Sequence, residues 1–160
     1  MISVVQRVQH AQVTVGDEVV GRIGHGLMVL VGVARGDTEA DVEATVRKLV
    51  ALRMFAGKTP MDLTIKDVNG EVLAVSQFTL VGRLYKGNRP SFDSAEAPER
   101  ANALYELFVS QLRGAGVHVQ TGRFGADMLV TLANDGPVTF IIETAGGALV
   151  KRDVTSPAPA

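Results

Sequence analysis

The 160-residue chain contains no cysteine, and this absence removes several kinds of chemistry at once. Without thiols there is no disulfide, no cysteine nucleophile and no cysteine-ligated zinc site. Tryptophan is also absent and aromatic residues make up only 5% of the chain, so Val, Leu, Ile and Ala must build the core. The net charge of −1 argues against a protein that coats nucleic acid by bulk electrostatics, although it allows a local basic face.

Long apolar runs are missing as well. The stretch 27–33 is far shorter than the ~20 residues that a membrane-spanning helix needs. The first residues, Met1-Ile2-Ser3-Val4-Val5-Gln6-Arg7, have the pattern of a strand and of neither a signal peptide nor a transit peptide. We therefore expect a cytoplasmic protein that does not act at a membrane.

The common catalytic signatures are absent too. There is no Gly-x-Ser-x-Gly elbow, no Walker loop and no dinucleotide fingerprint. The histidines, His10, His25 and His118, are far apart without metal-ligand spacing, so each is interpreted as a surface or turn residue. The sequence thus predicts no metal and no cofactor.

What is present is a mixture of strand and helix patterns. Apolar alternation in the first residues, a turn at Gly16-Asp17 and the two-faced apolar run 27–33 predict strands, the last of them central in a sheet. Thr38 and Asp41 are spaced as a weak capping box, and Pro98 fits the first turn of a second helix. Further strands are predicted at 71–80, 117–119, 128–133 and 138–142.

This order predicts an α+β fold. We expect a three-layer arrangement with stacked β-sheets and two helices packed on one face. A single domain should span residues 1–144, since domains commonly contain about 100 to 150 residues. Gly, Ala, Ser and Pro dominate the tail 145–160, which is expected to be disordered after about Lys151.

The most informative segment is Asn134-Asp135-Gly136-Pro137-Val138-Thr139, between two apolar runs where a hairpin turn is expected. Proline has no N–H for a sheet ladder, and glycine has no Cβ to hinder an unusual backbone path. Such a segment can present bare carbonyl oxygens to a ligand. The simpler interpretation is a plain turn, because these are ordinary turn residues.

A second segment, Ser76-Gln77-Phe78-Thr79-Leu80, places three hydrogen-bonding side chains at the end of an apolar strand. It is either a strand that reaches the surface or a strand end that lines a pocket, with hydroxyls and backbone N–H groups directed at a carbonyl. Neither Ser76 nor Thr79 has an evident base in the sequence. The basic residues Arg83, Lys86 and Arg89 that follow are either a solvated loop face or phosphate contacts.

Together these segments closely resemble the D-aminoacyl-tRNA deacylases. The matching stretches keep the family's order and span nearly all of residues 1–143. They are Val5-Gln6-Arg7-Val8, Ser76-Gln77-Phe78-Thr79-Leu80, Lys86-Gly87-Asn88-Arg89-Pro90-Ser91-Phe92, Thr121-Gly122-Arg123-Phe124-Gly125-Ala126-Asp127-Met128 and Asn134-Asp135-Gly136-Pro137-Val138-Thr139. The segment Val81-Gly82-Arg83-Leu84-Tyr85 departs from the more polar sequence that the family often carries.

The resemblance implies a homodimer with its active site at the subunit interface. A cis Gly136-Pro137 element would reach into the partner's pocket, capture the α-amino group with its carbonyls and leave no room for an L side chain. Glycine would escape this filter, so glycyl-tRNA mischarged on tRNA-Ala is an expected second substrate. The residues expected to support the element are Arg7, Asn134, Val138 and Thr139.

The resemblance also implies hydrolysis of the ester between a D-amino acid and the 3′ end of its tRNA. Ser76, Gln77, Phe78 and Thr79 would form the pocket, with backbone N–H groups near Phe78 and Thr79 stabilising the oxyanion. Family knowledge favours the ribose 2′-OH as the group that helps to activate water, and Thr79 as nucleophile is the older rival idea. Phe124 and Met128 would line the pocket for the terminal adenosine or the aminoacyl group.

Two other functions compete with this one. The first is a dimeric nucleic-acid-binding module without catalysis, against which the near-neutral charge argues. The second is a serine hydrolase that pairs Ser76 with His25 or His118, which requires these side chains to meet in the fold.

Overall fold

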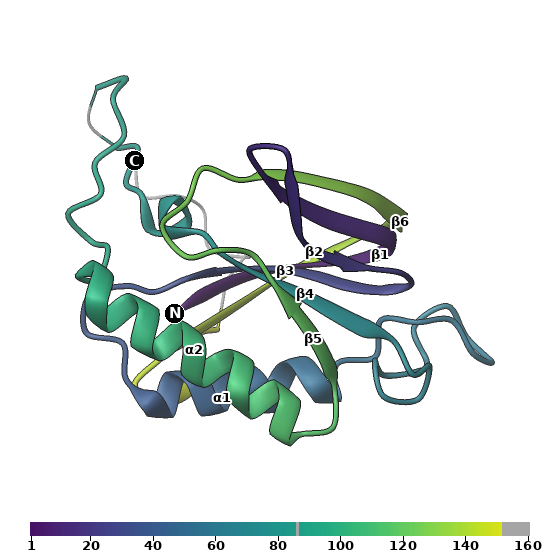
Figure 1. Ribbon diagram of the computed structural model, residues 1–160. Helices are drawn as coiled ribbons and strands as arrows, with labels where there is room; N and C mark the ends of the chain where they lie inside the picture. The colour runs from purple at the N-terminus through teal and green to yellow at the C-terminus, as the bar shows by residue number, and fades with distance from the viewer. Residues whose placement is uncertain (86, 152–160) are drawn as a thin grey trace.

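A computed structural model describes residues 1–85 and 87–151 of the chain (Figure 1). Its strands form one sheet in the order β5-β4-β3-β1-β6-β7, with β2 paired to β1 outside that path. The strands are β1 (Ile2–Val15), β2 (Glu18–Ile23), β3 (Gly26–Gly32), β4 (Glu71–Ser76), β5 (His118–Thr121), β6 (Leu129–Ala145) and β7 (Ala148–Leu149). The helices are α1 (Glu39–Ala51), the 3₁₀ turn η1 (Phe78–Val81) and α2 (Pro98–Gly114).

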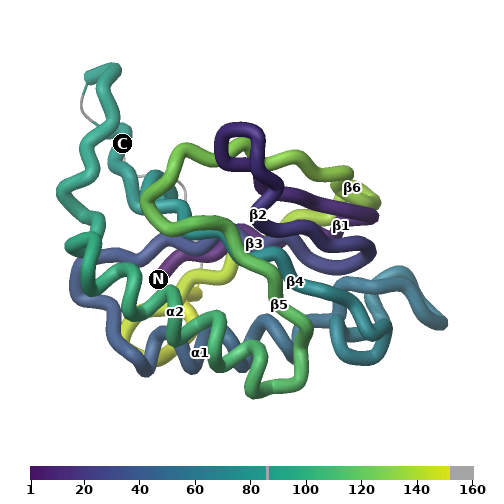
Figure 2. The backbone as a smooth tube through the Cα atoms, in the orientation of Figure 1, coloured from purple at the N-terminus to yellow at the C-terminus, as the bar shows by residue number. Residues whose placement is uncertain are grey.

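Both α-helices pack on the same face of the sheet, below it in Figures 1 and 2. The far ends of β1 and β6, together with β2, curl over the opposite face. This gives the three layers that the sequence predicts and confirms the α+β class. One detail differs, because the two stacked β layers belong to one curled sheet.

The larger core lies between the helices and the sheet. It contains fully buried side chains such as Val5, Val29, Leu49 and Phe108. Strand β3 is central in the sheet, between β1 and β4, and is buried on both faces, as the two-faced apolar run predicts. Its residues Val29 and Val31 belong to this core, whereas Met28 belongs to the core on the other face.

The second core fills the inside of the curl, where Val13, Ile23, Met28 and Leu73 pack together. Strand β2 crosses β5 so closely that a Cβ on Gly21 would overlap the carbonyl oxygen of Thr121. Glycine at this position therefore allows the sheet to fold back on itself.

Three local predictions are confirmed. The Gly16-Asp17 turn joins β1 to β2, and Gly16 has a positive φ of 58°. Thr38 and Asp41 form the predicted capping box at the start of α1, and Pro98 begins α2.

Within the described part of the chain, no helix is both long and apolar enough to cross a membrane.

The strand predicted at 71–80 ends early. Its partner strand β3 stops at Gly32. The last backbone hydrogen bond between the two neighbouring segments is from Gln77 N to Val31 O, at 2.7 Å. The chain then turns, with Leu80 N donating to Gln77 O at 3.2 Å. Phe78 and Thr79 thus lie in a 3₁₀ turn and not in a strand.

The hairpin predicted around Gly136-Pro137 is wrong, because residues 129–145 form one strand. Strand β6 runs antiparallel to β1 along its whole length, from Leu129 opposite Thr14 to Glu143 opposite Ile2. The register jumps in the middle of this pairing. The proline therefore interrupts a ladder without reversing the chain.

The chain continues in regular structure past residue 144. Gly146-Gly147 turns β6 into β7, and Gly147 N donates to the buried Asp41 carboxylate at 2.8 Å. The Asp41 carboxylate also accepts a hydrogen bond from Thr38 N at 2.9 Å. Of the expected C-terminal tail, residues 152–160 lie outside the described residues.

Asp41 thus joins the start of α1 to the C-terminal hairpin. Burial alone would raise its pKa, but the hydrogen bonds from Gly147 and Thr38 together hold the pKa of Asp41 below its ordinary value. A carboxylate whose pKa is lower in the folded state stabilises the fold above its unfolded pKa, and this contribution disappears as the pH falls through the folded value.

We predict that Asp41→Asn lowers the free energy of unfolding at pH 7 by about 1–3 kcal/mol, because the N–H groups of Thr38 and Gly147 lose a charged acceptor. The difference from the wild type should begin to shrink below about pH 4, the pKa of an unfolded aspartate, and should disappear once the pH falls below the lowered pKa of the folded carboxyl. Urea unfolding at several pH values measures both effects, with the exposed Glu43→Gln on the same helix as the matched control. A difference independent of pH would contradict this role.

Candidate functional site

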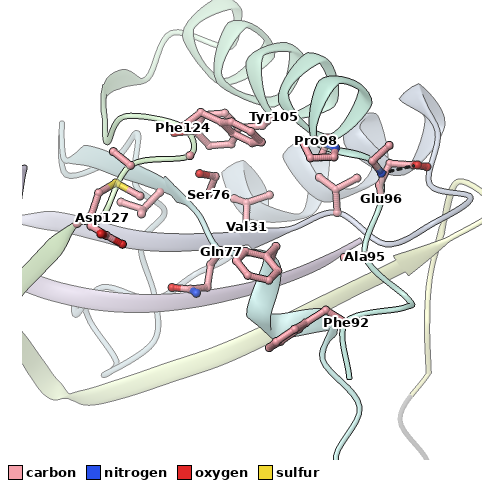
Figure 3. A pocket seen from close by; sticks show the side chains of 18 of the residues that line it. Val31, Ser76, Gln77, Phe92, Ala95, Glu96, Pro98, Tyr105, Phe124 and Asp127 are labelled. Carbon is pink, nitrogen blue, oxygen red and sulfur yellow. Dashed lines mark hydrogen bonds between the residues drawn. The ribbon is translucent and has the colours of Figure 1, made fainter. Parts of the chain in front are cut away.

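The parallel strands β3 and β4 end side by side at the mouth of a cavity of about 820 Å³. Ser76, the last residue of β4, lines it with the next two residues, Gln77 and Phe78. Carboxyl ends of parallel strands commonly open on a ligand site, because the strands stop there and the loops diverge. Figure 3 shows Ser76 and Gln77 facing this space.

The opposite wall is aromatic and comes from α2 and the loop after β5. Tyr105 and Phe124 have ring centroids 6.1 Å apart, and both line the cavity (Figure 3). The Tyr105 hydroxyl donates to Ala74 O at 2.8 Å. Burial raises the pKa of Tyr105 far above its ordinary value, so the phenol stays neutral and shapes the wall.

The start of η1 offers backbone donors beside Ser76. The first hydrogen bond of this turn is from Leu80 N, so the N–H groups of Phe78 and Thr79 have no acceptor within the turn. Such free N–H groups at the edge of an apolar cavity suit an oxygen that gains negative charge.

Thr79 itself does not line the cavity. Its hydroxyl accepts a short hydrogen bond from the Gln77 side-chain amide, at an exposed position. Among the described residues, no side chain that could act as a base is hydrogen-bonded to this hydroxyl, as activation of a nucleophile would require.

The histidines lie away from this site, which contradicts the serine-hydrolase hypothesis. His118 pairs with Glu71 at the start of β4, whereas Ser76 is at its end, about 16 Å along an extended strand. His25 precedes β3 at the same far end and packs edge-on against Phe55, with ring centroids 5.1 Å apart. No histidine therefore reaches Ser76.

The cavity also contains charged residues. Arg35 and Glu96, which the sequence did not single out, line it near the start of α2, and Asp127 of the motif 121–128 lines it next to Met128. Hydrogen bonds from the N–H groups of Ala97 and Gly36 lower the pKa of Glu96, which makes it a weak proton acceptor. Among the residues with a described placement, no cluster of His, Asp or Glu could hold a metal ion.

Gly136 and Pro137 lie elsewhere, in a bulge of β6. The ladder pairs Val8 with Asn134 and Gln6 with Thr139, so residues 135–138 have no partner in it, and the side chain of Val138 packs into the core. The peptide bond between Gly136 and Pro137 is cis, and both residues are exposed. Gly136 has a φ of 124°, and a Cβ there would lie 2.6 Å from the Val138 side chain. Only glycine fits this backbone.

Arg7 holds one side of the bulge. Its Nε forms an ion pair with Asp135 Oδ2 at 2.9 Å and donates to Asp135 O at 3.3 Å. Its Nη1 donates to Met54 O at 2.6 Å. Asp135, interpreted from the sequence as a turn residue, is therefore the anchor of the bulge.

Asn134 closes the base of the bulge. Its side-chain amide donates to Arg7 O at 2.9 Å and to Val138 O at 3.0 Å, which ties the two ends of the bulge together. Thr139 Oγ1 lies 3.5 Å from the Asn134 side-chain oxygen and accepts from the Gln6 side chain at 3.2 Å.

The twelve residues predicted for the site thus fall into two separate groups. Ser76, Gln77, Phe78, Phe124 and Met128 line the cavity, with Thr79 next to them. Arg7, Asn134, Gly136, Pro137, Val138 and Thr139 form the bulge, and none of them lines the cavity of the same chain. The sequence did not reveal Tyr105, because its position in a helix predicts core packing equally well.

We predict that Asn134→Ala lowers the free energy of unfolding by about 1–3 kcal/mol, since two carbonyls lose their donor. Asn102→Ala, which removes an exposed amide bonded only to Glu106, should cost about 0.5 kcal/mol or less. Urea unfolding compares the two variants, and hydrogen exchange at the Val138 amide reports on the bulge. Equal costs in both variants would show that Asn134 does not hold it.

Comparison with known proteins gives a consistent result. A family model described as D-Tyr-tRNA(Tyr) deacylase matches residues 4–143. A D-aminoacyl-tRNA deacylase of Desulfitobacterium hafniense is 56% identical over 145 residues, covering 90% of this chain and 97% of the relative. One from Dehalococcoides mccartyi is 52% identical over 145 residues, covering 90% of this chain and 95% of the relative.

Two solved structures share the fold of this chain. The c-Myc DNA unwinding element binding protein matches with a TM-score of 0.85 and 41% identity, covering 91% of this chain and 99% of that one. A probable eukaryotic D-amino acid tRNA deacylase has the same fold, with a TM-score of 0.74 and 21% identity, covering 88% of this chain and 97% of that one.

Proposed function

The chain belongs to the D-Tyr-tRNA(Tyr) deacylase family, and we propose that it cleaves D-aminoacyl-tRNA at a pocket that two subunits build together. As a D-aminoacyl-tRNA deacylase it is a carboxylic ester hydrolase. Water adds to the ester carbonyl, the bond from the carbonyl carbon to the ribose oxygen breaks, and that oxygen takes up a proton. The products are free tRNA and a D-amino acid, which makes the reaction a chiral proofreading step in translation. Charged tRNA is the substrate of the cytoplasmic translation machinery, so we place the protein there.

The observation that carries the proposal is the separation of cavity and bulge. Gly136 and Pro137 protrude from the sheet, fixed by Arg7 and Asn134, yet do not touch the cavity of their own chain. A rigid protrusion with exposed carbonyls suits insertion into a second copy of the same cavity. Phe78 at the cavity rim is 56% exposed, which leaves an apolar edge for that copy to cover.

In such a homodimer the bulge decides which substrates enter. Its carbonyls accept hydrogen bonds from the α-ammonium group of the substrate, and the backbone around Gly136 fills the space that an L side chain would need. A D side chain points the other way and is accepted. Glycine has no side chain to exclude, so glycyl-tRNA mischarged on tRNA-Ala is a second substrate.

The chemistry relies on positioning and on backbone donors. The N–H groups of Phe78 and Thr79 stabilise the oxyanion, and Ser76 and Gln77 orient the ester. Among the described residues that line the cavity there is no histidine, and Glu96 is a weak proton acceptor, so we assign the activation of water to the ribose 2′-OH of the substrate. Phe124 and Met128 line the space for the terminal adenosine or the aminoacyl group.

A nucleic-acid-binding module without catalysis is the second candidate. The solved structure with 41% identity is of a protein named for binding a DNA element, and this name is the observation that favours DNA binding as the second candidate. Binding of duplex DNA with a steep salt dependence and no ester hydrolysis would support it over the deacylase.

The proposal predicts rapid loss of the ester from D-Tyr-tRNA and from glycyl-tRNA, with L-Tyr-tRNA left intact. Pro137→Ala should reduce the ratio of D to L rates by about tenfold or more, the scale on which a pocket contact discriminates. The matched control is Pro60→Ala, an exposed proline in a distant loop, which should keep the wild-type ratio. Equal wild-type rates on both tyrosyl substrates would reject the proposed function, and an unchanged ratio in Pro137→Ala would reject the bulge as its filter.

A second prediction separates the two nucleophile hypotheses. If Thr79 attacked the ester, Thr79→Val would lower kcat by about 10⁶-fold, as loss of a nucleophile does. We expect a loss of about tenfold at most, because the Thr79 hydroxyl is engaged by Gln77. A D-aminoacyl-tRNA with a terminal 2′-deoxyribose should instead react about 10²-fold or more slowly. Normal hydrolysis of the deoxy substrate would contradict the role of the 2′-OH.

A further inference from the structure

A protruding loop, which we call the finger, lies next to the cavity. It comprises residues 83–85 and 87–91 and stands away from the body at the upper left of Figure 1. Arg83 and Ser91 close its base with two backbone hydrogen bonds, of 2.8 and 3.0 Å. The two sides of the finger are therefore held together where they leave the body.

The base of the finger is continuous with the wall of the cavity. Phe92 follows Ser91 directly and lines the cavity (Figure 3). Its ring packs edge-on against Phe78, with centroids 5.0 Å apart. A substrate strand that left the cavity beside Phe92 would therefore come close to the base of the finger.

Two apolar side chains of the finger are turned to solvent. Tyr85 is 95% exposed and Leu84 is 71% exposed, more than any other large hydrophobic residue with a described placement. Neither contributes appreciable buried area to the fold, so both side chains are available for contact with a partner. The sequence of this segment is also where the chain departs from the polar residues usual in its family.

Positive charge accompanies the exposed ring. The side chains of Arg83 and Arg89 are exposed, and neither has an ion-pair partner among the residues that the structure describes. An exposed aromatic ring in the same loop as two unpaired guanidinium groups can combine stacking on a base with contacts to phosphates.

We propose that the finger binds the unpaired 3′ strand of the substrate tRNA, with Tyr85 stacking on a nucleobase and Arg83 and Arg89 contacting the backbone phosphates. The inference rests on the proposed function, because that function puts the terminal aminoacyl-adenosine in the cavity and the preceding nucleotides outside it. Single-stranded RNA offers unstacked bases, which aromatic side chains recognise.

A second copy of the chain is a less suitable partner for the finger than an RNA strand. Two fingers brought together by a two-fold axis would place their arginines near one another, and like charges in contact oppose association. An RNA strand instead supplies a negative phosphate for each guanidinium.

The test compares a long and a short substrate, D-Tyr-tRNA and 3′-O-D-tyrosyl-adenosine. Tyr85→Ala should raise KM for the tRNA about tenfold, the size expected for loss of one stacked base, with kcat unchanged. Its kinetics on tyrosyl-adenosine should equal those of the wild type, because that substrate ends inside the cavity. Tyr85→Trp should keep the wild-type KM, and Leu84→Ala serves as the control for an exposed apolar side chain without a ring.

The arginines have a separate readout. Arg83→Ala and Arg89→Ala should each reduce the slope of log KM against log salt concentration by about 0.7, as expected for one phosphate contact to a single strand. Arg47→Ala, an exposed arginine on α1, should leave the slope unchanged.

Three outcomes would overturn the inference: an unchanged KM for Tyr85→Ala, equal losses on both substrates, or a shift of Tyr85→Ala to monomer in sedimentation. The last would show that the ring covers a second subunit instead of RNA. Failure of the proposed function is distinguishable, because the wild type would then fail to prefer the D form of tyrosyl-adenosine, which does not reach the finger.

Discussion

The geometry of the site depends on the guanidinium group of Arg7. This side chain is 12% exposed and comes from the middle of the sheet, on strand β1. It binds the carboxylate and carbonyl of Asp135 and the carbonyl of Met54, which joins the bulge to the segment after α1. Charged hydrogen bonds from a planar fork fix orientation as well as distance. A bulge without such an anchor would move with the strand edge, and a filter for handedness needs a backbone that does not yield to the wrong substrate.

The same fold keeps the cavity and the bulge apart. Strands β3 and β4 open the cavity at their carboxyl ends, while the bulge lies in β6, on the other side of β1. One chain therefore carries a pocket and a bulge that do not meet. In the proposed symmetric dimer, a two-fold axis would bring each bulge to the other subunit's pocket. The pocket would then need few reactive side chains, because discrimination would come from the rigid backbone of the bulge, and the finger beside Phe92 would hold the RNA.

Much of the fold follows from the sequence, for identifiable reasons. The two-faced apolar run of β3, the capping box of Thr38 and Asp41 and the proline at the start of α2 are local signals, and each is found in place. Two predictions were wrong at positions where the neighbouring strand determines the structure. Strand β4 ends at Ser76 because β3 ends beside it, and Gly136-Pro137 is a bulge because β1 continues past it. The motif residues of the site were identified by resemblance, whereas Tyr105, Arg35 and Glu96 were missed because only the fold brings them to the cavity.

The most direct test of a filter shared between subunits is a crystal structure of the protein with a non-hydrolysable D-aminoacyl-adenosine analogue. The proposed arrangement predicts a dimer in which the analogue lies in the cavity lined by Ser76, Phe78 and Phe124 of one subunit. The α-ammonium group should then lie within about 3.2 Å of a carbonyl oxygen from the Gly136-Pro137 segment of the other subunit. An analogue bound in that cavity with its ammonium group held only by residues of the same subunit, and with both bulges in solvent, would contradict it.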